Sequence, residues 1–303
     1  MLYGIEVVPL SRSLSEVFEK NHIKIAKTIQ GLPQQTPNLM PLATLGWSTM
    51  ESVLDIMKLI FLWHLLILPM NNVYKRLCVY ILTSTNFKPY YGPLGDLIRI
   101  VNKYDLTNIV VHSLTLGEYM SSRKWKRIVK LTVFNSEKYR WMASIHLYKS
   151  LKHVACSLNY GQLWPWWNYV RSFPRKKKDC LILLRLYSGE RCVQSCNELC
   201  RSYRMYDIKC KLCQYITSPN DANHIIFICP AVNDIRQVKL DVFISKCPVP
   251  LHKSWELMST ENKLVFMLSG FRIRYTPEWV SLYHAAADFV AGVYRKYSTL
   301  CSI

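Results

Sequence analysis

Apolar positions in the first third of the chain recur at helical spacing. Two capping-box patterns, Ser13-x-x-Glu16 and Ser48-x-x-Glu51, each precede such a run, because Ser and a Glu three residues later can satisfy the free amides of a helix start. Asn72 is placed to cap a third helix. Three helices with short joints predict a small bundle. The predicted apolar face of the first helix consists of Leu14, Val17, Phe18, Ile25 and Ile29.

The pattern is less regular in the middle of the chain and becomes helical again towards its end. Turn-forming residues gather at 86–95, which is the predicted linker, and helical spacing returns at 121–134 and 136–153. In the last helix, Thr276 is the predicted cap and Pro277 the first position, where a missing amide hydrogen costs nothing. Its predicted inward face consists of Val280, Tyr283, Ala287, Val290 and Tyr294.

The longest apolar run predicts a core helix and no membrane anchor. Leu59 to Met70 spans about a dozen residues and contains His64, whereas a membrane span needs roughly 20 apolar residues. Half of the 303 residues are hydrophobic, and the 11 cysteines are an odd number in a chain whose start does not have the pattern of a signal peptide. These features favour a folded intracellular protein, nuclear or cytoplasmic, in a reducing compartment.

One spacing points to a metal. Cys210, Cys213, His224 and Cys229 form the pattern C-x2-C-x10-H-x4-C, and four thiolate and imidazole ligands within one short loop are typical of a closed, structural zinc site. Reduced, partly buried cysteines beside a histidine would give the same letters. Asp221 precedes the histidine by three residues, so it either orients the imidazole from behind or is a solvated loop carboxylate.

Charge indicates the kind of partner. The chain carries 39 Lys and Arg against 20 Asp and Glu, a formal net charge of +19, which implies a polyanion, most simply nucleic acid, with membrane lipid as the competing choice. Basic residues surround Trp125, form one run of four, and flank Cys210, the first cysteine of the metal-binding pattern. The candidate nucleic-acid contacts are Arg123, Lys124, Lys126, Arg127, Arg175, Lys176, Lys177, Lys178, Lys209 and Lys211.

Each basic cluster also has an alternative interpretation. The cations around Trp125 can form a strand-binding groove with a stacking aromatic ring, or a solvated helix face above a buried tryptophan. The run at 175–178 is a phosphate contact, a nuclear signal or a solvated loop. Two further sets are expected to be core residues and not ligands or stacking platforms: Trp164, Trp166 and Trp167, and Cys192, Cys196 and Cys200.

The order of these pieces resembles the C-terminal part of a LINE-type non-LTR retrotransposon polyprotein. The segments LYGIEVV and LGWSTMESVLDIMKLIFLWHLL, within about residues 2–85, are similar to the thumb region that follows the reverse-transcriptase palm. LLRLYSG followed by the cysteine–histidine pattern, within about 180–230, is similar to the reverse-transcriptase zinc-binding domain. The resemblance implies the same four ligands, an acidic position at Asp221, and a role in gripping template RNA and target DNA.

Catalysis is not expected. The paired palm aspartates that two-metal phosphoryl transfer requires have no counterpart, because the sequence contains no Asp-Asp dipeptide. Some members of the resembling family carry a nuclease after the knuckle, and a residual metal-dependent endonuclease using Asp234, Glu261 and Lys263 is one alternative. A zinc-stapled protein-interaction module or a decayed element is the other.

The expected architecture is therefore mainly α: a small helical bundle, a helical linker and a compact zinc-knuckle domain with packed C-terminal helices. No small-molecule substrate is expected, and the oligomeric state stays open. The predicted boundaries are a thumb-like bundle at 1–85, a basic helical linker at 86–179, a reverse-transcriptase-type zinc-binding domain at 180–235 and a helical C-terminal extension at 236–303.

Overall fold

The computed structural model describes residues 8, 11–83, 92–189, 208–217, 222–272 and 275–302. Several predictions, namely most of the linker at 86–95, the three cysteines at 192, 196 and 200, and Asp221, lie outside the described residues. Within the described part the chain is almost entirely helical, with one hairpin of two-residue strands. The mainly α class with packed C-terminal helices is confirmed.

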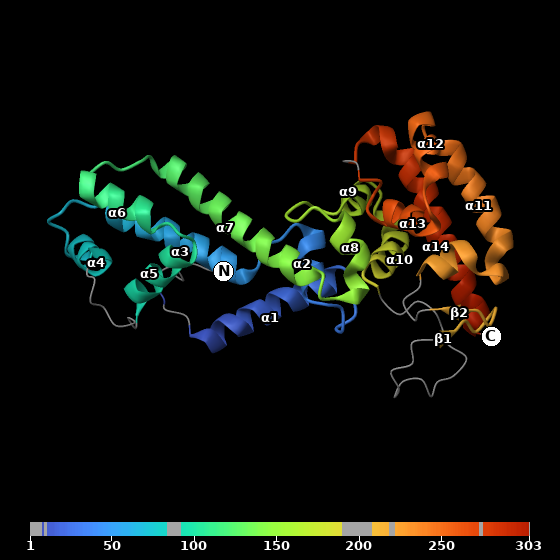
Figure 1. Cartoon of the computed structure of the whole chain (residues 1–303), viewed down its shortest axis with the longest axis horizontal. Coiled ribbons are helices and arrows are strands. Elements are labelled where there is room, and N and C mark those ends of the chain that lie inside the picture. The colour runs from blue at the N-terminus through green and yellow to red at the C-terminus, as the bar shows by residue number, and fades with distance from the viewer. Residues whose placement is uncertain are drawn as a thin grey trace. The chain divides into compact units, whose positions relative to one another are not determined.

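The chain divides into two compact units. The N-terminal unit comprises residues 1–25 and 48–141, and the C-terminal unit comprises residues 26–47 and 142–303. Helices α1 (Arg12–Ile29) and α7 (Ser122–Ile145) each continue from one unit into the other (Figure 1). These boundaries are drawn from contacts in space, so the four-part division along the sequence stays a prediction.

The N-terminal unit is built around one apolar helix. Leu59, Leu62 and Trp63 of α3 are buried, and the Trp63 ring stacks on Trp125 of α7 at a centroid distance of 4.6 Å. Leu59–Leu66 of the predicted run thus belong to a core helix, while Ile67 and Met70 lie beyond its end and are exposed. No helix in the described part is long and apolar enough to cross a membrane. The helices that complete this unit with α7 are α3 (Met50–Leu66), α4 (Val73–Thr83), α5 (Pro93–Lys103) and α6 (Thr107–Leu116).

The helix starts lie close to their predicted positions, but two of the three caps differ. Asn72 caps α4 as predicted, since its Oδ1 accepts the Tyr74 amide at 2.9 Å. At α3 the cap is Thr49, which accepts from the amide of Ser52, one residue after the predicted Ser48. At α1 the hydroxyl of Ser11 accepts the Leu14 amide. In both cases a neighbouring hydroxyl residue fits the same pattern, and sequence spacing alone does not choose between them.

The predicted inward face of α1 is wrong. Leu14, Val17, Ile25 and Ile29 are 42–54% exposed. The helix instead contacts its neighbours through polar groups, and Glu19 accepts the backbone amide of Met50 at 2.7 Å. Apolar periodicity therefore identified a helix here but not the side that it buries.

The C-terminal unit surrounds α14. Tyr283, Ala287 and Val290 are buried as predicted, while Val280 and Tyr294 are half-buried. Helices α10 and α11 pack against it. The elements of this unit are α2 (Leu39–Leu45), η2 (Lys149–Leu151), α8 (Lys152–Ser157), α9 (Pro165–Ser172), η3 (Pro174–Lys176), α10 (Lys177–Tyr187), β1 (Ile208–Lys209), β2 (Ile216–Thr217), η5 (His224–Ile228), η6 (Pro230–Val232), α11 (Asn233–Lys246), α12 (Val249–Leu257), α13 (Thr260–Leu268), η7 (Pro277–Trp279) and α14 (Val280–Ser302).

The tryptophans of α9 belong to this core. Trp164 and Trp166 are buried, and their indole nitrogens donate to the carbonyls of Leu268 at 2.9 Å and Met267 at 3.0 Å. These acceptors are among the last carbonyls of α13, which have no partner within their own helix. The expectation that these two side chains serve packing is confirmed, and Trp167 is half-buried.

Candidate metal centre

The first two cysteines lie on the turn of the small hairpin. Strands β1 and β2 pair antiparallel, and the Cys210 amide donates to the Tyr215 carbonyl at 2.9 Å. Gln214 takes a positive φ of 61° and donates its amide to the Cys210 carbonyl at 2.8 Å. This tight reversal places the cysteines at 210 and 213 on the same side of the turn, which is what a C-x2-C pair needs to share one ion.

The other two ligands are one turn of a π-helix apart. Element η5 begins at His224, and the Cys229 amide donates to the His224 carbonyl at 2.7 Å, an i→i+5 bond. A π-turn is rare and recurs at functional sites. Here it aligns residues five apart, so the H-x4-C spacing brings both side chains to the same face of one short element.

The four side chains converge. The ligand atoms of Cys210, Cys213, His224 and Cys229 all lie within 4.8 Å of one another, and Cys213 Sγ is 3.4 Å from His224 Nε2. Metal–sulfur bonds of about 2.3 Å and metal–nitrogen bonds of about 2.0 Å in a tetrahedron give edges of roughly 3.5–3.8 Å. The donor set and its dimensions therefore fit a metal ion held by three thiolates and one imidazole.

The thiols differ in their electrostatic surroundings. Burial raises the pKa of Cys229 to about 12. At Cys210, burial acts in the same direction, but hydrogen bonds from the Tyr297 hydroxyl and the amides of Cys213 and Leu212 outweigh it and hold the pKa below its usual range. Because a metal binds the deprotonated thiol, its binding here would release protons.

Helix α14 supports the hairpin at two points. The Tyr297 hydroxyl lies 3.4 Å from Cys210 Sγ. Near the end of the same helix, the Lys211 ammonium donates to the Cys301 carbonyl, where a cation is favoured by the helix dipole. Lys209 and Lys211 are both exposed, but the Lys211 ammonium is already engaged by this carbonyl.

A buried arginine supports the other half of the centre. Arg236 of α11 is 7% exposed and donates from Nε to the Ile226 carbonyl at 2.9 Å, and also to the Cys229 carbonyl. In addition, the Tyr215 ring stacks on the His224 ring at 5.4 Å. Arg236 and Tyr297 were missed by sequence reasoning, because neither belongs to the ligand spacing and each reaches the site from a separate helix.

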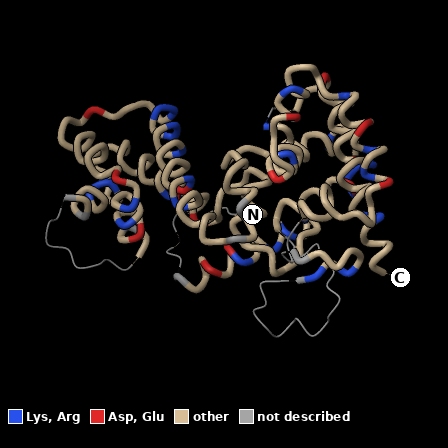
Figure 2. The backbone as a smooth tube through the Cα atoms, turned by 45° about the vertical axis from the view of Figure 1, so that its right-hand side comes forward, with Lys and Arg blue, Asp and Glu red and all other residues tan. Residues whose placement is uncertain are grey.

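The predicted basic clusters differ in how far their side chains are exposed or already paired. Arg123, Lys124, Lys126 and Arg127 are exposed on α7 while Trp125 is buried, and its indole donates to the Leu59 carbonyl at 2.9 Å. Trp125 is therefore a core residue and not a stacking platform, and the four cations lie on the exposed side of the same helix. Figure 2 shows Lys and Arg recurring along this helix.

In the run before α10, Arg175, Lys177 and Lys178 are exposed. Lys176 differs because its ammonium lies 2.6 Å from Asp288 and 3.5 Å from Asp179. Lys176, one of the four predicted phosphate contacts, thus forms ion pairs within the chain.

The candidate nuclease residues do not join such a cluster. Asp234 and Glu261 lie in the first turns of α11 and α13, and the Lys263 ammonium lies 5.4 Å from the centre of the Trp255 ring. Among the described residues, groups of three or more His, Cys, Asp or Glu side chains that could hold a metal are limited to the cysteine–histidine set.

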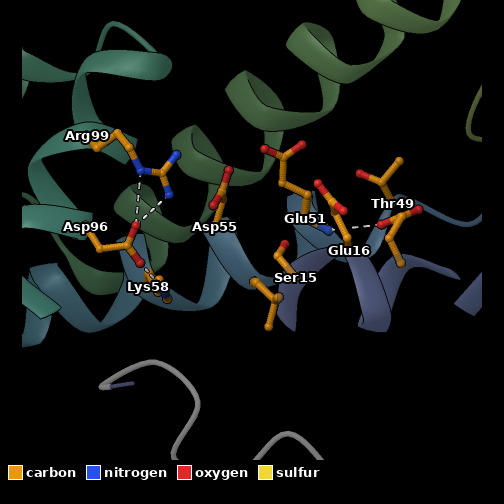
Figure 3. Close-up of a pocket in the computed structure, with 10 residues that line it drawn as sticks. Ser15, Glu16, Thr49, Glu51, Asp55, Lys58, Asp96 and Arg99 are labelled. Atoms are coloured by element: carbon orange, nitrogen blue, oxygen red, sulfur yellow. Dashed lines mark hydrogen bonds and ion pairs between the residues drawn. The ribbon is translucent and has the colours of Figure 1, made fainter. Parts of the chain in front are cut away.

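The N-terminal unit holds an acid-rich cavity of about 630 Å³. Figure 3 shows Lys58 and Arg99 meeting the Asp96 carboxylate. Nearby, Lys103 lies 2.6 Å from Glu51 and 2.7 Å from Asp55. Ammonium and guanidinium groups thus neutralise Asp96, Glu51 and Asp55, and the resulting ion pairs join α3 to α5.

Comparisons of the chain with protein-family models, with curated proteins and with solved structures find no match.

Proposed function

We propose that this chain is a non-catalytic protein that binds zinc and nucleic acid, and that it is a piece of a retroelement reverse-transcriptase polyprotein that grips template RNA or target DNA. The convergence of three cysteines and one histidine within 4.8 Å carries the proposal. Tetrahedral sulfur and nitrogen ligation selects zinc among the common biological metals, with iron–sulfur centres as the competitor.

The metal's proposed role is structural. Four protein side chains complete the tetrahedron and leave no position for water or substrate, and closed sites of this kind contribute directly to folding. Two ligands lie on the turn between two-residue strands, and the other two lie at the start and just after the end of one five-residue π-turn. Elements this short bury little surface of their own, so an ion that ties them together supplies much of their stability.

Charge supports the nucleic-acid part of the proposal. The chain has a formal net charge of +19, and its exposed cations include Arg123, Lys126 and Arg127 on α7 and Lys177 and Lys178 on α10. Exposed cations that recur on helical faces attract a phosphate backbone irrespective of its sequence. No catalytic step is proposed, because the polymerase aspartate pair has no counterpart in the sequence.

Metal content tests the first half of the proposal. Purified full-length chain should contain one zinc per molecule, and Cys213→Ser should lower that occupancy. Cys247→Ser is the matched control, since Cys247 is also half-buried but lies outside the ligand set. Full zinc occupancy in the Cys213 variant, or another metal in the parent chain, would contradict the proposed centre.

Binding across a salt series tests the second half. The zinc-loaded chain should bind RNA and DNA of unrelated sequence, with log K falling linearly against log salt concentration by about 0.7–0.9 for each phosphate neutralised. Binding that is weak and insensitive to salt would contradict it.

A second candidate, a zinc-stapled protein-interaction module, is favoured by one feature of α4. Val73, Tyr74, Leu77 and Tyr80 are 46–70% exposed and recur along one side of the helix, and clustered exposed apolar residues are typical of protein interfaces. Zinc uptake without salt-sensitive nucleic-acid binding is the result that would favour this candidate.

A further inference from the structure

We infer that one face of α7 is the surface that holds a single nucleic-acid strand, with phosphates along a row of cations and a base against an apolar floor. This α7 groove is lined by Ser48, Ile56, Arg123, Lys126, Arg127, Lys130, Leu131, Val133 and Phe134 and has a volume of about 660 Å³. The inference rests on the proposed nucleic-acid binding and specifies both where it occurs and which form of nucleic acid is held.

The cations form a row because of their spacing. Lys126, Arg127 and Lys130 follow Arg123 by three, four and seven residues, which places all four on one face of an α-helix. At 1.5 Å per residue the row is about 10 Å long, so it can follow a strand over a few nucleotides. All four side chains are exposed.

None of these four cations takes part in an ion pair among the described residues. In contrast, Arg140, farther along the same helix, lies 3.1 Å from Glu51. The groove lining contains no carboxylate, unlike the acid-rich cavity of the same unit. Its positive charge is thus not neutralised by the protein around it, and the complementary ligand is an anion with several charges.

The floor of the groove is apolar. Leu131 is 57% exposed, and Phe134 and Ile56 line the groove beside it. Phe134 follows Lys130 by one helical turn, so its ring lies on the face that carries the cations. Alternating phosphate contacts and aromatic stacking are how proteins hold single strands without reading their sequence.

The opposite face of α7 fixes the row in place. Trp125 and Val129 are buried in the core of the N-terminal unit, and Trp125 is held both by stacking on Trp63 and by its hydrogen bond to α3. The charged face therefore stands on a rigid helix. A preorganised row loses less conformational freedom on binding than mobile side chains on a loop would.

The apolar floor favours a single strand over the other polyanions. A duplex stacks its bases inside and presents mainly sugar and phosphate to a shallow groove, so Leu131 and Phe134 would gain little from it. An acidic peptide could meet the charge, because the guanidinium groups of Arg123 and Arg127 pair with carboxylate and phosphate alike, but it offers no planar base that could stack on Phe134.

The test uses the zinc-loaded full chain, fluorescein-labelled 20-mers of oligo(dT) and oligo(U), a duplex of equal length and polyglutamate as competitor. Arg123→Gln/Arg127→Gln should weaken binding of both single strands about tenfold at 0.1 M salt, and should reduce the salt slope by about 1.4, since each phosphate contact to a single strand contributes about 0.7. Lys20→Gln/Arg76→Gln is the control with equal charge loss, as both residues are exposed elsewhere in the N-terminal unit.

Phe134→Leu separates stacking from charge, because it keeps an apolar floor and every cation. It should weaken single-strand binding about fivefold, at the lower end of what one stacked base contributes, and should leave duplex binding unchanged. Circular dichroism of each variant should equal that of the parent chain.

The outcomes separate nucleic-acid binding itself, its location in the α7 groove and the preference for a single strand. If the chain binds strands but the Arg123/Arg127 variant matches the parent in affinity and slope, the α7 groove is the wrong surface while nucleic-acid binding stands. If the parent binds no nucleic acid, both proposals fail. If Phe134→Leu has no effect, or if polyglutamate displaces the strand at equal charge concentration, the single-strand assignment is wrong, and a duplex or an acidic peptide takes its place.

Discussion

Replacing Arg236 by Met should weaken the metal centre without touching a ligand. The guanidinium is buried and donates to the carbonyls of Ile226 and Cys229, and to Asn233 Oδ1 at 3.2 Å. Both carbonyls belong to the π-turn segment that carries His224 and Cys229. Methionine retains a long apolar stem of similar reach and removes all of these donors.

The cost follows from the two carbonyls left without this donor. A buried acceptor that loses its partner costs about 1–3 kcal/mol, so two would cost up to about 6 kcal/mol. The Cys229 carbonyl keeps the Val232 amide at 3.5 Å, which reduces its share. Burial also penalises the guanidinium charge and lowers the pKa of Arg236, and its removal returns part of that loss. We therefore expect a net destabilisation of about 2–4 kcal/mol, and a loss of zinc affinity of about 10- to 100-fold, as is typical when a group that orients ligands is removed.

Two measurements check this. Urea unfolding of the zinc-loaded chain gives the stability, and competition with a chromophoric chelator gives the zinc affinity. Gln237→Met is the matched control, because Gln237 is the next residue of α11 and is exposed. If Arg236→Met retains the zinc affinity and the unfolding free energy of that control, the guanidinium does not hold the ligand segment and the reasoning is refuted.

Two further predictions concern other contacts. At Asp96, burial raises the pKa, but hydrogen bonds and charge from Lys58 and Arg99 outweigh it and hold the pKa below its usual value of 3.8. The stability that this carboxylate contributes is therefore present above pH 3.8 and is lost as the pH falls through the lower folded pKa. Asp96→Asn should cost about 3 kcal/mol at pH 7 and flatten this acid dependence, measured by urea unfolding at pH 7 and pH 3; an unchanged pH profile would count against it. Tyr297→Phe should lower zinc affinity about tenfold, whereas Tyr283→Phe, which loses a hydrogen bond to the Gly270 carbonyl, should lower stability alone; equal zinc affinities would contradict the role of Tyr297.

Sequence patterns predicted the features that depend only on residues close together in the chain. Asn72 marked a helix start, because a capping side chain acts on amides two or three residues away. The ligand spacing predicted the cluster for the same reason, since two of the ligands lie on one turn and the other two on one π-turn. The Thr276–Pro277 pair instead precedes the short η7 turn before α14, and the Thr276 side chain makes no capping hydrogen bond. The stretches at 121–134 and 136–153 were separated by a break that does not exist, because α7 continues through Ser136 to Ile145.

Residues whose role depends on distant contacts escaped prediction. Which face of α1 is buried depends on α3, whose Met50 amide is held by Glu19, and apolar periodicity carries no information about that partner. Lys176 and Lys178 are two residues apart and of the same type, yet among the described residues only Lys176 of the two forms an ion pair with Asp288, which is more than a hundred residues away. Arg236 and Tyr297 likewise meet the centre from α11 and α14, so no motif could include them.

The supports of the metal centre also indicate what the ion stabilises. The Cys210 thiol contacts the Tyr297 hydroxyl, and the Lys211 ammonium donates to the Cys301 carbonyl. The Phe227 ring of the π-turn lies 5.8 Å from the Phe289 ring. All three partners belong to α14. The hairpin and the π-turn are short elements that bury little surface of their own, and α14 packs against the π-turn. Because α14 also packs on α10 and α11, an ion bound at the edge of the C-terminal unit stabilises the packing of its central helix. The α7 groove lies in the other unit and is built on a core that contains none of the metal ligands, so the two proposed sites depend on separate parts of the chain.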